Sequence, residues 1–242
     1  MEIIHLDTID STNRYCELLD LDQVEEFTIV YADEQTAGKG QQNHVWESQT
    51  GKNLTLSIIL HPTFIQIPDQ YQLHKALSLA VVDLLKALGI SNLHIKWPND
   101  IYVADKKICG ILVANKLSKN ILQSSICGIG LNVNQTEFPA WVPNPISISQ
   151  ITHQEYDLPL LLSQLAQCLM SRYQMLKRGE LQHIDRDYMD CLMNLGVEKK
   201  YLYQSETILA TITGINRYGH LLLKTSKQEE ISCQMGEISL IS

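Results

Sequence analysis

Residues 93–133 constrain the fold of this chain more than any other segment. LHIKW has the composition of a strand, and Pro98 ends it because proline fixes φ and has no backbone N–H to donate. DIYVADKKICGILVAN then forms a predicted hairpin that turns at 104–106, and ILQSSICGIGLNV is the next predicted strand. Strands joined by such short turns pair antiparallel, so the sequence favours an antiparallel or mixed sheet over a doubly wound one.

Periodicity predicts the elements around this sheet. Ser11 is typical of an N-cap, and the residues after it predict a helix over 12–21. Alternating residues predict a strand over 27–35 that ends near Ala32 and another over 53–60, separated by a long glycine-bearing loop. Apolar residues three and four apart predict a helix over 70–88 closed by Gly89, and two more helices near 155–178 and 180–194. We therefore expect an α+β fold.

The pattern changes after Leu195 and Gly196. Short segments rich in β-formers follow one another, separated by turn residues: KKYLYQ, TILATITGINRYG, HLLLKT and EEISCQMGEISLI. This spacing predicts a small β-barrel. We expect two domains, residues 1–195 and residues 196–242.

Composition excludes several classes of protein. The formal net charge of −8 argues against a nucleic-acid-binding surface, which needs clustered Lys and Arg. The six cysteines are scattered, without CxxC or other metal-ligand spacing. The N-terminus lacks the pattern of a signal peptide, and no apolar run approaches the roughly 18 residues of a membrane span. We expect a cytoplasmic protein that binds neither membrane nor nucleic acid, with no metal site from a protein motif.

Two loop motifs carry candidate functional groups. Gly38, Lys39 and Gly40 would let backbone N–H groups and one ammonium approach an anion, although a loop of this kind is more often an ordinary surface loop. Asn99 and Asp100 follow Pro98 and should lie at a sheet edge, although Asn-Asp after a strand is most often just a turn.

The hairpin carries the third candidate. Lys107 precedes the apolar run ICGILV, where it either extends its ammonium to solvent or presents a desolvated cation to an anionic ligand. Gly128 and Gly130 in the next strand allow a close approach of a ligand or mark a tight strand crossing. No histidine spacing, nucleophile elbow or thiol motif supports a metalloprotease, serine hydrolase or thiol enzyme.

Taken together, the motifs occur in the order and spacing of biotin–protein ligases. The matching segments are Ser11-Thr12-Asn13, DEQTAGKG with a following Trp46, GKNLTLS, IKWPND, KKICGILV, GIGLNVN and GEISL. The chain resembles this family over almost its whole length, and KWPND followed by KICGIL is highly specific. The resemblance implies a class II synthetase-like fold with a mainly antiparallel sheet packed with helices, followed by a small C-terminal SH3-like barrel.

The resemblance also implies a reaction in two steps. Biotin and MgATP give biotinyl-5′-AMP and pyrophosphate, and the biotinyl group then passes to one lysine of a biotin carboxyl carrier domain. Because the biotin carboxylate is already ionised, the first step needs no base; it needs two anions to be brought together and the developing charge to be stabilised. ATP and Mg²⁺ are the implied cofactors, and a homodimer is left open.

Candidate site residues are carried over from the family motif by motif. The implied catalytic residues are Lys39, Lys107 and Asp100, with Asp100 positioning or deprotonating the acceptor lysine. The implied biotin-binding residues are Ser11, Thr12, Asn13, Gln35, Gly38, Lys39, Gly40, Gln41, Lys107, Gly110, Gly128 and Gly130. The implied nucleotide-binding residues are Lys39, Gln41, Trp46, Asn99, Lys107 and Asn132.

This sequence departs from the family pattern in the glycine loop. The family usually has GRGRxG, whereas residues 38–43 read GKGQQN, which replaces both arginines and the last glycine. Lys39 keeps a charge without the planar guanidinium fork, and Gln41 keeps no charge. Asn43 is a milder change, because Asn tolerates left-handed backbone geometry. Early release of the adenylate is therefore a hypothesis for this chain.

Three alternatives and expectations accompany this interpretation. Many relatives carry an N-terminal helix-turn-helix, whereas the Ser-Thr-Asn motif here begins at residue 11, so we expect a monofunctional ligase that does not bind DNA. A lipoate or octanoate transferase of the same fold is the first alternative. A biotin-binding relative that has lost catalysis is the second, because the arginines are missing.

Overall fold

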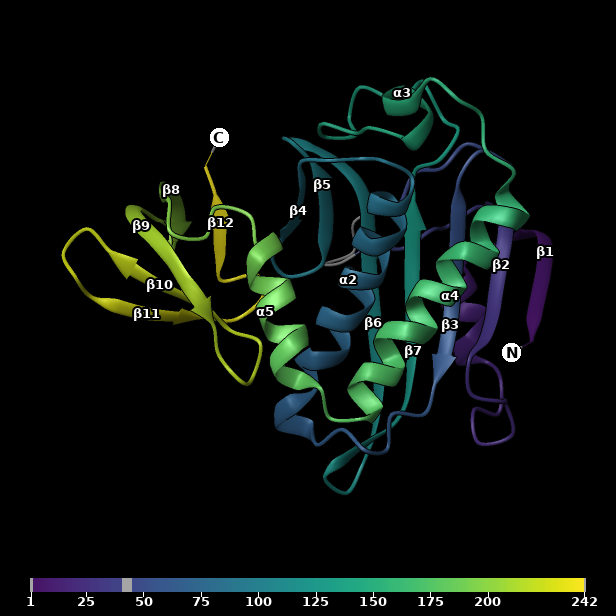
Figure 1. Ribbon diagram of the computed structural model, residues 1–242, viewed down its shortest axis with the longest axis horizontal. Helices are drawn as coiled ribbons and strands as arrows, with labels where there is room; N and C mark the ends of the chain where they lie inside the picture. Colours follow the sequence, from purple (N-terminus) through teal and green to yellow (C-terminus); the bar gives the residue numbers. More distant parts are fainter. Residues whose placement is uncertain (1, 41–44, 242) are drawn as a thin grey trace.

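The computed structural model describes residues 2–40 and 45–241, and its centre is a seven-stranded sheet (Figure 1). The strand order is β1-β2-β3-β7-β6-β5-β4. All neighbouring pairs are antiparallel except β1 and β2, which are parallel. The strands are β1 (Ile3–Ile9), β2 (Thr28–Gln35), β3 (Leu54–Leu60), β4 (Leu93–Lys96), β5 (Asp100–Val103), β6 (Lys106–Ser118) and β7 (Ile121–Leu131). The expected mixed, mainly antiparallel sheet is confirmed.

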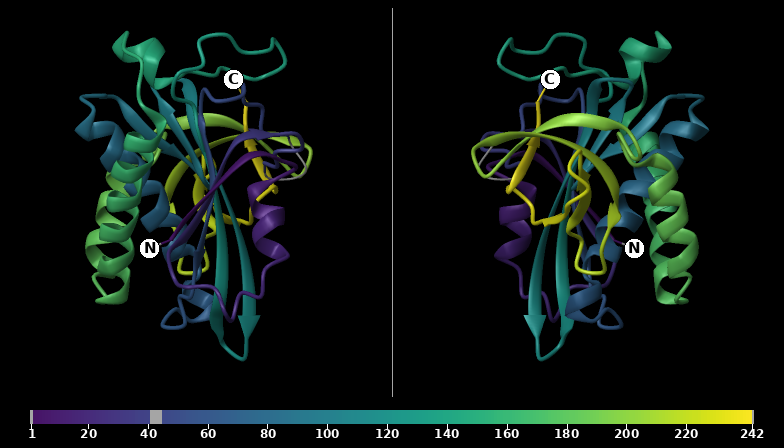
Figure 2. Two further views of the ribbon diagram at one scale, coloured as in Figure 1. Left: turned by 90° about the vertical axis from the view of Figure 1, so that its right-hand side faces the viewer. Right: turned by 90° about the vertical axis from the view of Figure 1, so that its left-hand side faces the viewer.

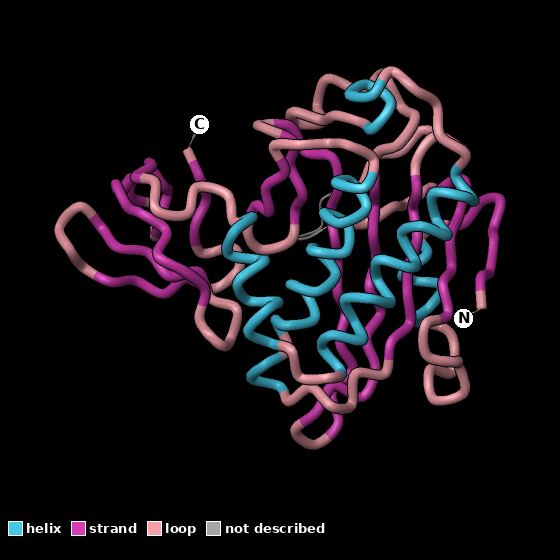
Figure 3. The backbone as a smooth tube through the Cα atoms, in the orientation of Figure 1, coloured by secondary structure: helices cyan, strands magenta, loops and turns pink. Residues whose placement is uncertain are grey.

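Helices cover one face of this sheet, and α1 (Thr12–Glu17) lies on the other (Figure 2). The covering helices are α2 (Tyr71–Ala87), α4 (Leu158–Lys177) and α5 (Leu181–Cys191), and they pack side by side over the sheet (Figure 3). All seven residues of β3 are buried, because helices cover one of its faces and α1 packs against the other. The side chains of Leu54, Leu56 and Ile58 enter the helix-covered core, while Ile59 packs with Cys16 of α1.

Helix α2 is the centre of that core and holds one buried charge. Its apolar residues pack between the sheet and the helices α4 and α5, and burial of each large side chain contributes about 1.5–3 kcal/mol. The Lys75 side chain is 7% exposed, and its ammonium lies 2.6 Å from Asp185 on α5 and 5.8 Å from the rings of Tyr71 and Tyr188. A buried cation is tolerated only when it is paired in this way, so Lys75 ties α2 to α5.

Several predicted boundaries differ from the observed ones. Helix α1 ends at Glu17 rather than at residue 21, and β2 continues past Ala32 to Gln35 because it pairs with β1 along its length. Strand β1 and the short helix α3 (Ile148–Thr152) were not expected. Parallel pairing of β1 with β2 depends on a contact between distant segments, which local periodicity does not report. The hairpin turn between Val103 and Lys106 is where the sequence predicts it.

The last strands form a second, antiparallel sheet of five strands in the order β11-β10-β9-β8-β12. They are β8 (Glu198–Tyr203), β9 (Glu206–Ile215), β10 (Leu221–Thr225), β11 (Glu230–Cys233) and β12 (Ile238–Leu240). This small unit lies beside α5 and the β4 edge of the large sheet (Figure 1). No helix of residues 2–40 and 45–241 has both the length and the apolar character that a membrane crossing requires.

One turn of the small sheet fastens it to the large one. The Trp97 Nε1–H donates to the Gly219 carbonyl at 2.9 Å, and the Tyr71 ring packs so closely on Gly219 that a Cβ there would lie 2.5 Å from it. The Arg217 guanidinium makes two hydrogen bonds, of 2.6 and 2.7 Å, to the Asp69 carboxylate. These contacts set the C-terminal sheet against the segment that carries Asn99 and Asp100.

Candidate active site

A cavity of about 590 Å³ lies on the α1 side of the large sheet and extends to the C-terminal sheet. Of the residues predicted for the site, those that line it are Ser11, Thr12, Asn13, Gln35, Lys39, Gly40, Trp46, Asn99, Asp100, Lys107, Gly110, Gly128, Gly130 and Asn132. Gly38 lies just outside this lining, where its carbonyl accepts from the Trp46 N–H at 2.9 Å. The prediction for Gln41 lies outside the described residues. The structure therefore gathers predicted residues from five separate motifs into one cavity.

Gly110, Gly128 and Gly130, on the neighbouring strands β6 and β7, form the floor of the cavity. Gly128 pairs with Ser57 on one side and Leu112 on the other, and Gly130 pairs with Thr55 and Gly110. Glycine is required in this floor because other side chains lie directly on it. A Cβ at Gly130 would lie 2.3 Å from Trp46 Cε2, and a Cβ at Gly128 would lie 2.3 Å from Asn13 Oδ1.

Buried polar side chains form one end of the cavity. Thr12 donates its backbone N–H to Gln35 Oε1 at 2.8 Å, and its hydroxyl lies 2.7 Å from Ser57 Oγ. Ser57 also hydrogen-bonds Asn13 Oδ1. Ser11 occupies the predicted N-cap position, but its side chain makes no capping bond, so its hydroxyl stays available to the cavity. This end presents donors and acceptors to a small polar ligand.

A cation and a carboxylate form the other end. Lys107 Nζ lies 2.8 Å from Asp100 Oδ1 and 5.7 Å from the centre of the Trp46 ring. The side chains of Lys107 and Asp100 are 28% and 26% exposed, so this ammonium is partly hydrated rather than fully desolvated. The backbone of Lys107 is fixed by hydrogen bonds with Asn144 and Ile146, which lock it between the hairpin and the segment before α3.

Two predicted asparagines are held by the backbone around them. The side-chain amide of Asn99 donates to the Ile111 carbonyl. The backbone carbonyl of Asn99 accepts from the Ile111 N–H at 3.1 Å. Asn132 donates to the Ile146 carbonyl at 3.0 Å, while its backbone carbonyl accepts from Ile148. Both asparagines therefore brace the walls of the cavity as well as line it.

The sequence did not indicate two other walls. The segment between β7 and α3 contributes Phe138, Trp141 and Val142, of which Trp141 is 60% exposed. The C-terminal sheet contributes Tyr201, Ile238 and other apolar residues. Ser57 was also missed, although it lies in the quoted segment GKNLTLS; its burial behind Thr12 and Asn13 becomes visible only from the sheet register.

Burial changes the chemistry of several titratable groups near the cavity. Burial and then the nearby Asp100 raise the pKa of Tyr102 to about 12. Burial raises the pKa of Cys109 and Cys127 well above that of an ordinary thiol, and it raises the pKa of Cys16 to about 12. These thiols stay protonated at neutral pH, which makes them poor nucleophiles and agrees with the absence of a thiol motif.

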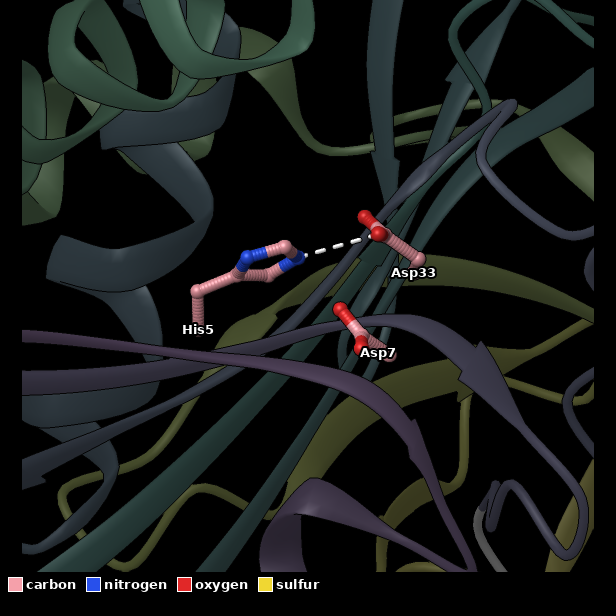
Figure 4. A group of neighbouring side chains, drawn as sticks. All are labelled: His5, Asp7 and Asp33. Atoms are coloured by element: carbon pink, nitrogen blue, oxygen red, sulfur yellow. Dashed lines mark ion pairs between the residues drawn. The ribbon is translucent and has the colours of Figure 1, made fainter.

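A small group of ligand-type side chains lies apart from the cavity, on β1 and β2 (Figure 4). His5 Nε2 lies 3.0 Å from Asp33 Oδ2, and the potential ligand atoms of His5, Asp7 and Asp33 lie within 4.8 Å of one another. The His5 and Asp33 side chains are about two-fifths exposed and the His5 ring stacks on Tyr31, so a surface ion pair accounts for the arrangement.

Known proteins are similar to this chain in sequence and in fold. The profile of the biotin/lipoate A/B protein ligase family matches residues 6–132. The bifunctional ligase/repressor BirA of Bacillus spizizenii is 32% identical over 228 residues, which cover 93% of this chain and 70% of that protein. A biotin protein ligase from Aquifex aeolicus, solved with biotin and ATP, is 28% identical and superposes with a TM-score of 0.83, covering 99% of this chain and 98% of its own.

A more distant structure agrees in fold. The biotin protein ligase of Leishmania major, solved with biotinyl-5-AMP, is 19% identical with a TM-score of 0.66, over 96% of this chain and 98% of that one. The family match over residues 6–132 includes the second half of β1, the glycine loop, KWPND and the two glycines of β7. The chain belongs to the biotin/lipoate A/B protein ligase family.

Proposed function

We propose that this protein is an ATP-dependent biotin–protein ligase. It joins biotin to AMP with release of pyrophosphate and then transfers the biotinyl group to a lysine of an acceptor protein. One observation carries the proposal: the Lys107–Asp100 pair and the polar group of Thr12, Asn13 and Gln35 line the same cavity, beside Trp46. The similarity to the biotin protein ligase of Aquifex aeolicus, which was solved with biotin and ATP, supports the choice of substrates.

In the first step, a biotin carboxylate oxygen attacks the α-phosphorus of ATP, and the bond to the β-phosphate breaks. Lys107 would bind the carboxylate and the phosphate oxygens, since an ammonium in a partly buried site stabilises charge more strongly than it does in water. Lys39, which lines the same cavity, would add a second positive charge. Mg²⁺ enters with the triphosphate, so we assign it no protein ligands.

In the second step, the neutral amine of the acceptor lysine attacks the acyl carbon, and the bond to AMP breaks. The amine must lose a proton, and Asp100, which lies beside Lys107 in the cavity, is suited to receive it or to orient the amine. The apolar walls would protect the mixed anhydride from water in the meantime. Trp46 would pack beside the nucleotide, with Asn99 and Asn132 bracing that part of the wall.

A biotin carboxyl carrier domain is the acceptor that we propose. We also propose that residues 1–195 form the catalytic domain, that residues 196–242 form an accessory SH3-like domain, and that the protein acts in the cytoplasm without binding nucleic acid. The net charge of −8 supports the last point, because a phosphate backbone would be repelled.

The proposal is tested by incubating the protein with ATP, biotin and an unmodified carrier domain, followed by intact mass of the carrier. We expect the carrier to gain the mass of one biotinyl group, and only when ATP is present. A carrier that stays unmodified while the protein still binds biotin would instead indicate a biotin-binding relative without catalysis.

A lipoate or octanoate transferase is the alternative within the same family. Thermal unfolding in the presence of biotin, lipoate or octanoate separates the two, because a ligand that binds only the folded state raises its unfolding temperature. We expect biotin alone to do so, since the polar end of the cavity suits a ureido ring and would leave buried polar groups unpaired against an alkyl chain.

A further inference from the structure

Ser57 is a buried side chain that touches the polar end of the cavity from behind. It lies on β3, is 0% exposed, and is not among the residues that line the cavity. Its hydroxyl contacts two residues that do line it, Thr12 and Asn13. A group in this place cannot touch a ligand, yet it can decide how the groups that do touch the ligand are oriented.

The structure places the amide oxygen of Asn13, which can only accept, against the Ser57 hydroxyl, and this contact decides where the hydroxyl protons point. Three contacts run in a chain from Gln35 to Thr12, from Thr12 to Ser57 and from Ser57 to Asn13, but Thr12 and Ser57 have only one hydroxyl proton each. Gln35 Oε1 already accepts the Thr12 backbone N–H at 2.8 Å, and its contact with the Thr12 hydroxyl is the longer, at 3.2 Å. Because Asn13 Oδ1 can only accept, the single Ser57 proton points to it, and the 2.7 Å contact between Ser57 and Thr12 is then a hydrogen bond in which Thr12 donates.

The neighbouring thiol does not compete for this proton. Cys16 also lies against Ser57, and burial raises the pKa of the thiol to about 12, so at neutral pH it is uncharged. A neutral thiol accepts hydrogen bonds only weakly, whereas the amide oxygen of Asn13 is a strong acceptor. The Ser57 proton is thus committed to Asn13.

This commitment fixes which atom of Asn13 faces the ligand. With Oδ1 held toward Ser57, the amide nitrogen Nδ2 has no acceptor among the described residues, and Asn13 lines the cavity. The whole amide group lies against the floor, where a Cβ at Gly128 would be 2.3 Å from Oδ1 and 3.0 Å from Nδ2, so Nδ2 is the amide atom without a partner at the cavity. The cavity therefore presents an N–H donor at this point, suited to an acceptor atom of the ligand.

We propose that Ser57 is a positioning residue that sets the hydrogen-bond polarity of the biotin pocket, by holding the Asn13 amide with its N–H group toward the ureido carbonyl oxygen of biotin. The proposal rests on the proposed function. Without the Ser57 hydroxyl, the Asn13 amide can rotate and present either its oxygen or its nitrogen. The pocket then binds biotin more weakly and discriminates less between a ligand with an acceptor and one with a donor at this place.

The test compares biotin with 2-iminobiotin, in which an imino group that is protonated at neutral pH replaces the ureido oxygen. The dissociation constants of both are measured by calorimetry for the wild type and for Ser57→Ala. We expect biotin to bind roughly tenfold more weakly to Ser57→Ala and the preference for biotin over 2-iminobiotin to shrink several-fold, while the KM for ATP stays within about twofold of the wild type.

Thr55→Val is the matched control. Thr55 lies on the same strand and the same face, two residues away, is equally buried, and donates its hydroxyl to the Ala32 carbonyl rather than to Thr12 or Asn13. The Thr55→Val variant should leave the ratio of the dissociation constants for biotin and 2-iminobiotin unchanged. Ser57→Thr, which keeps the hydroxyl, should restore most of the biotin affinity and of the preference.

Each result has a distinct meaning. If Ser57→Ala binds biotin as the wild type does, or loses affinity for biotin and 2-iminobiotin by the same factor, the positioning role is refuted. If the wild type itself does not bind biotin, the proposed function fails instead. Should the alanine variant not fold, Ser57→Cys keeps nearly the same volume with a much weaker donor, and the same shrinkage of the preference is expected from it.

Discussion

Lys107 Nζ and Asp100 Oδ1 lie 2.8 Å apart, on neighbouring strands of one hairpin, although the two residues come from different sequence motifs. A bulge between Ile101 and Tyr102 shifts the register so that Lys107 pairs opposite Tyr102. The pair places a cation and a carboxylate side by side at the point where the two proposed reaction steps need one of each.

Replacement of the cation should stop the first step. Lys107→Ala is expected to lower the rate of biotin-dependent exchange of pyrophosphate into ATP by roughly 10²-fold or more, because it removes a preorganised charge at the developing anion. Lys106→Ala is the matched control, since Lys106 is the adjacent lysine of β6 and is exposed. Comparable losses in the two variants would argue against a specific role for Lys107.

Replacement of the carboxylate should affect the second step more than the first. Asp100→Asn cannot take a proton from the acceptor amine, so transfer of biotin to the carrier domain should fall by about 10²-fold. Pyrophosphate exchange, which needs no base, should fall much less. Single-turnover measurements from the preformed adenylate separate the two steps, and an equal loss in both would assign Asp100 to binding alone.

The glycine floor predicts a graded response to alanine. A Cβ at Gly130 would lie 2.3 Å from Trp46, whereas a Cβ at Gly110 would lie 3.1 Å from it. Gly130→Ala must displace the indole and should reduce adenylation by roughly 10²-fold, while Gly110→Ala should be several-fold milder. Tryptophan fluorescence should report the displacement, and equal effects would show that Trp46 does not pack on this floor during the reaction.

The unusual glycine loop predicts weak retention of the adenylate. A double variant, Lys39→Arg with Gln41→Arg, restores two guanidinium groups, each able to hold phosphate oxygens at two points. Biotinyl-AMP should leave this variant at least about tenfold more slowly than the wild type. Rapid gel filtration of the complex gives its half-life. An unchanged half-life would contradict the hypothesis that the wild type releases the adenylate early.

The stability that the Arg217–Asp69 contact between the two sheets contributes should depend on pH. Hydrogen bonds from Arg217 hold the pKa of Asp69 below its ordinary range. A carboxylate with a lowered pKa contributes stability that is complete above its unfolded pKa of about 4, and the contribution is lost as the pH falls through the folded value. The Arg217 side chain is 58% exposed, so water screens the pair, and Arg217→Gln should lower the unfolding temperature by only about 1–3 °C at pH 7.

This difference should shrink as the pH falls through the lowered pKa of Asp69, because a protonated carboxyl no longer forms an ion pair with Arg217. Calorimetry across this pH range checks the expectation. A difference that stays constant with pH would show that Arg217 acts through packing rather than through the carboxylate.

Local patterns in the sequence determined most of the strands and helices. Pro98 ends β4, residues 104 and 105 turn the hairpin, and the apolar spacing over 70–88 forms α2, because each of these depends on neighbours within a few residues. The family motifs also identified the polar residues at both ends of the cavity and the glycines of its floor.

Tertiary structure alone decided how those residues meet. Ser57 lies opposite Gly128 and behind Asn13 only because β3 pairs with β7 in one particular register, and a shift of one residue would turn Ser57 into the core. The pairing of β1 with β2, the reach of Trp97 to Gly219, and the wall supplied by Tyr201 likewise join residues that are far apart along the chain. No local pattern contains these contacts, because their free energy exists only when distant segments are already packed together.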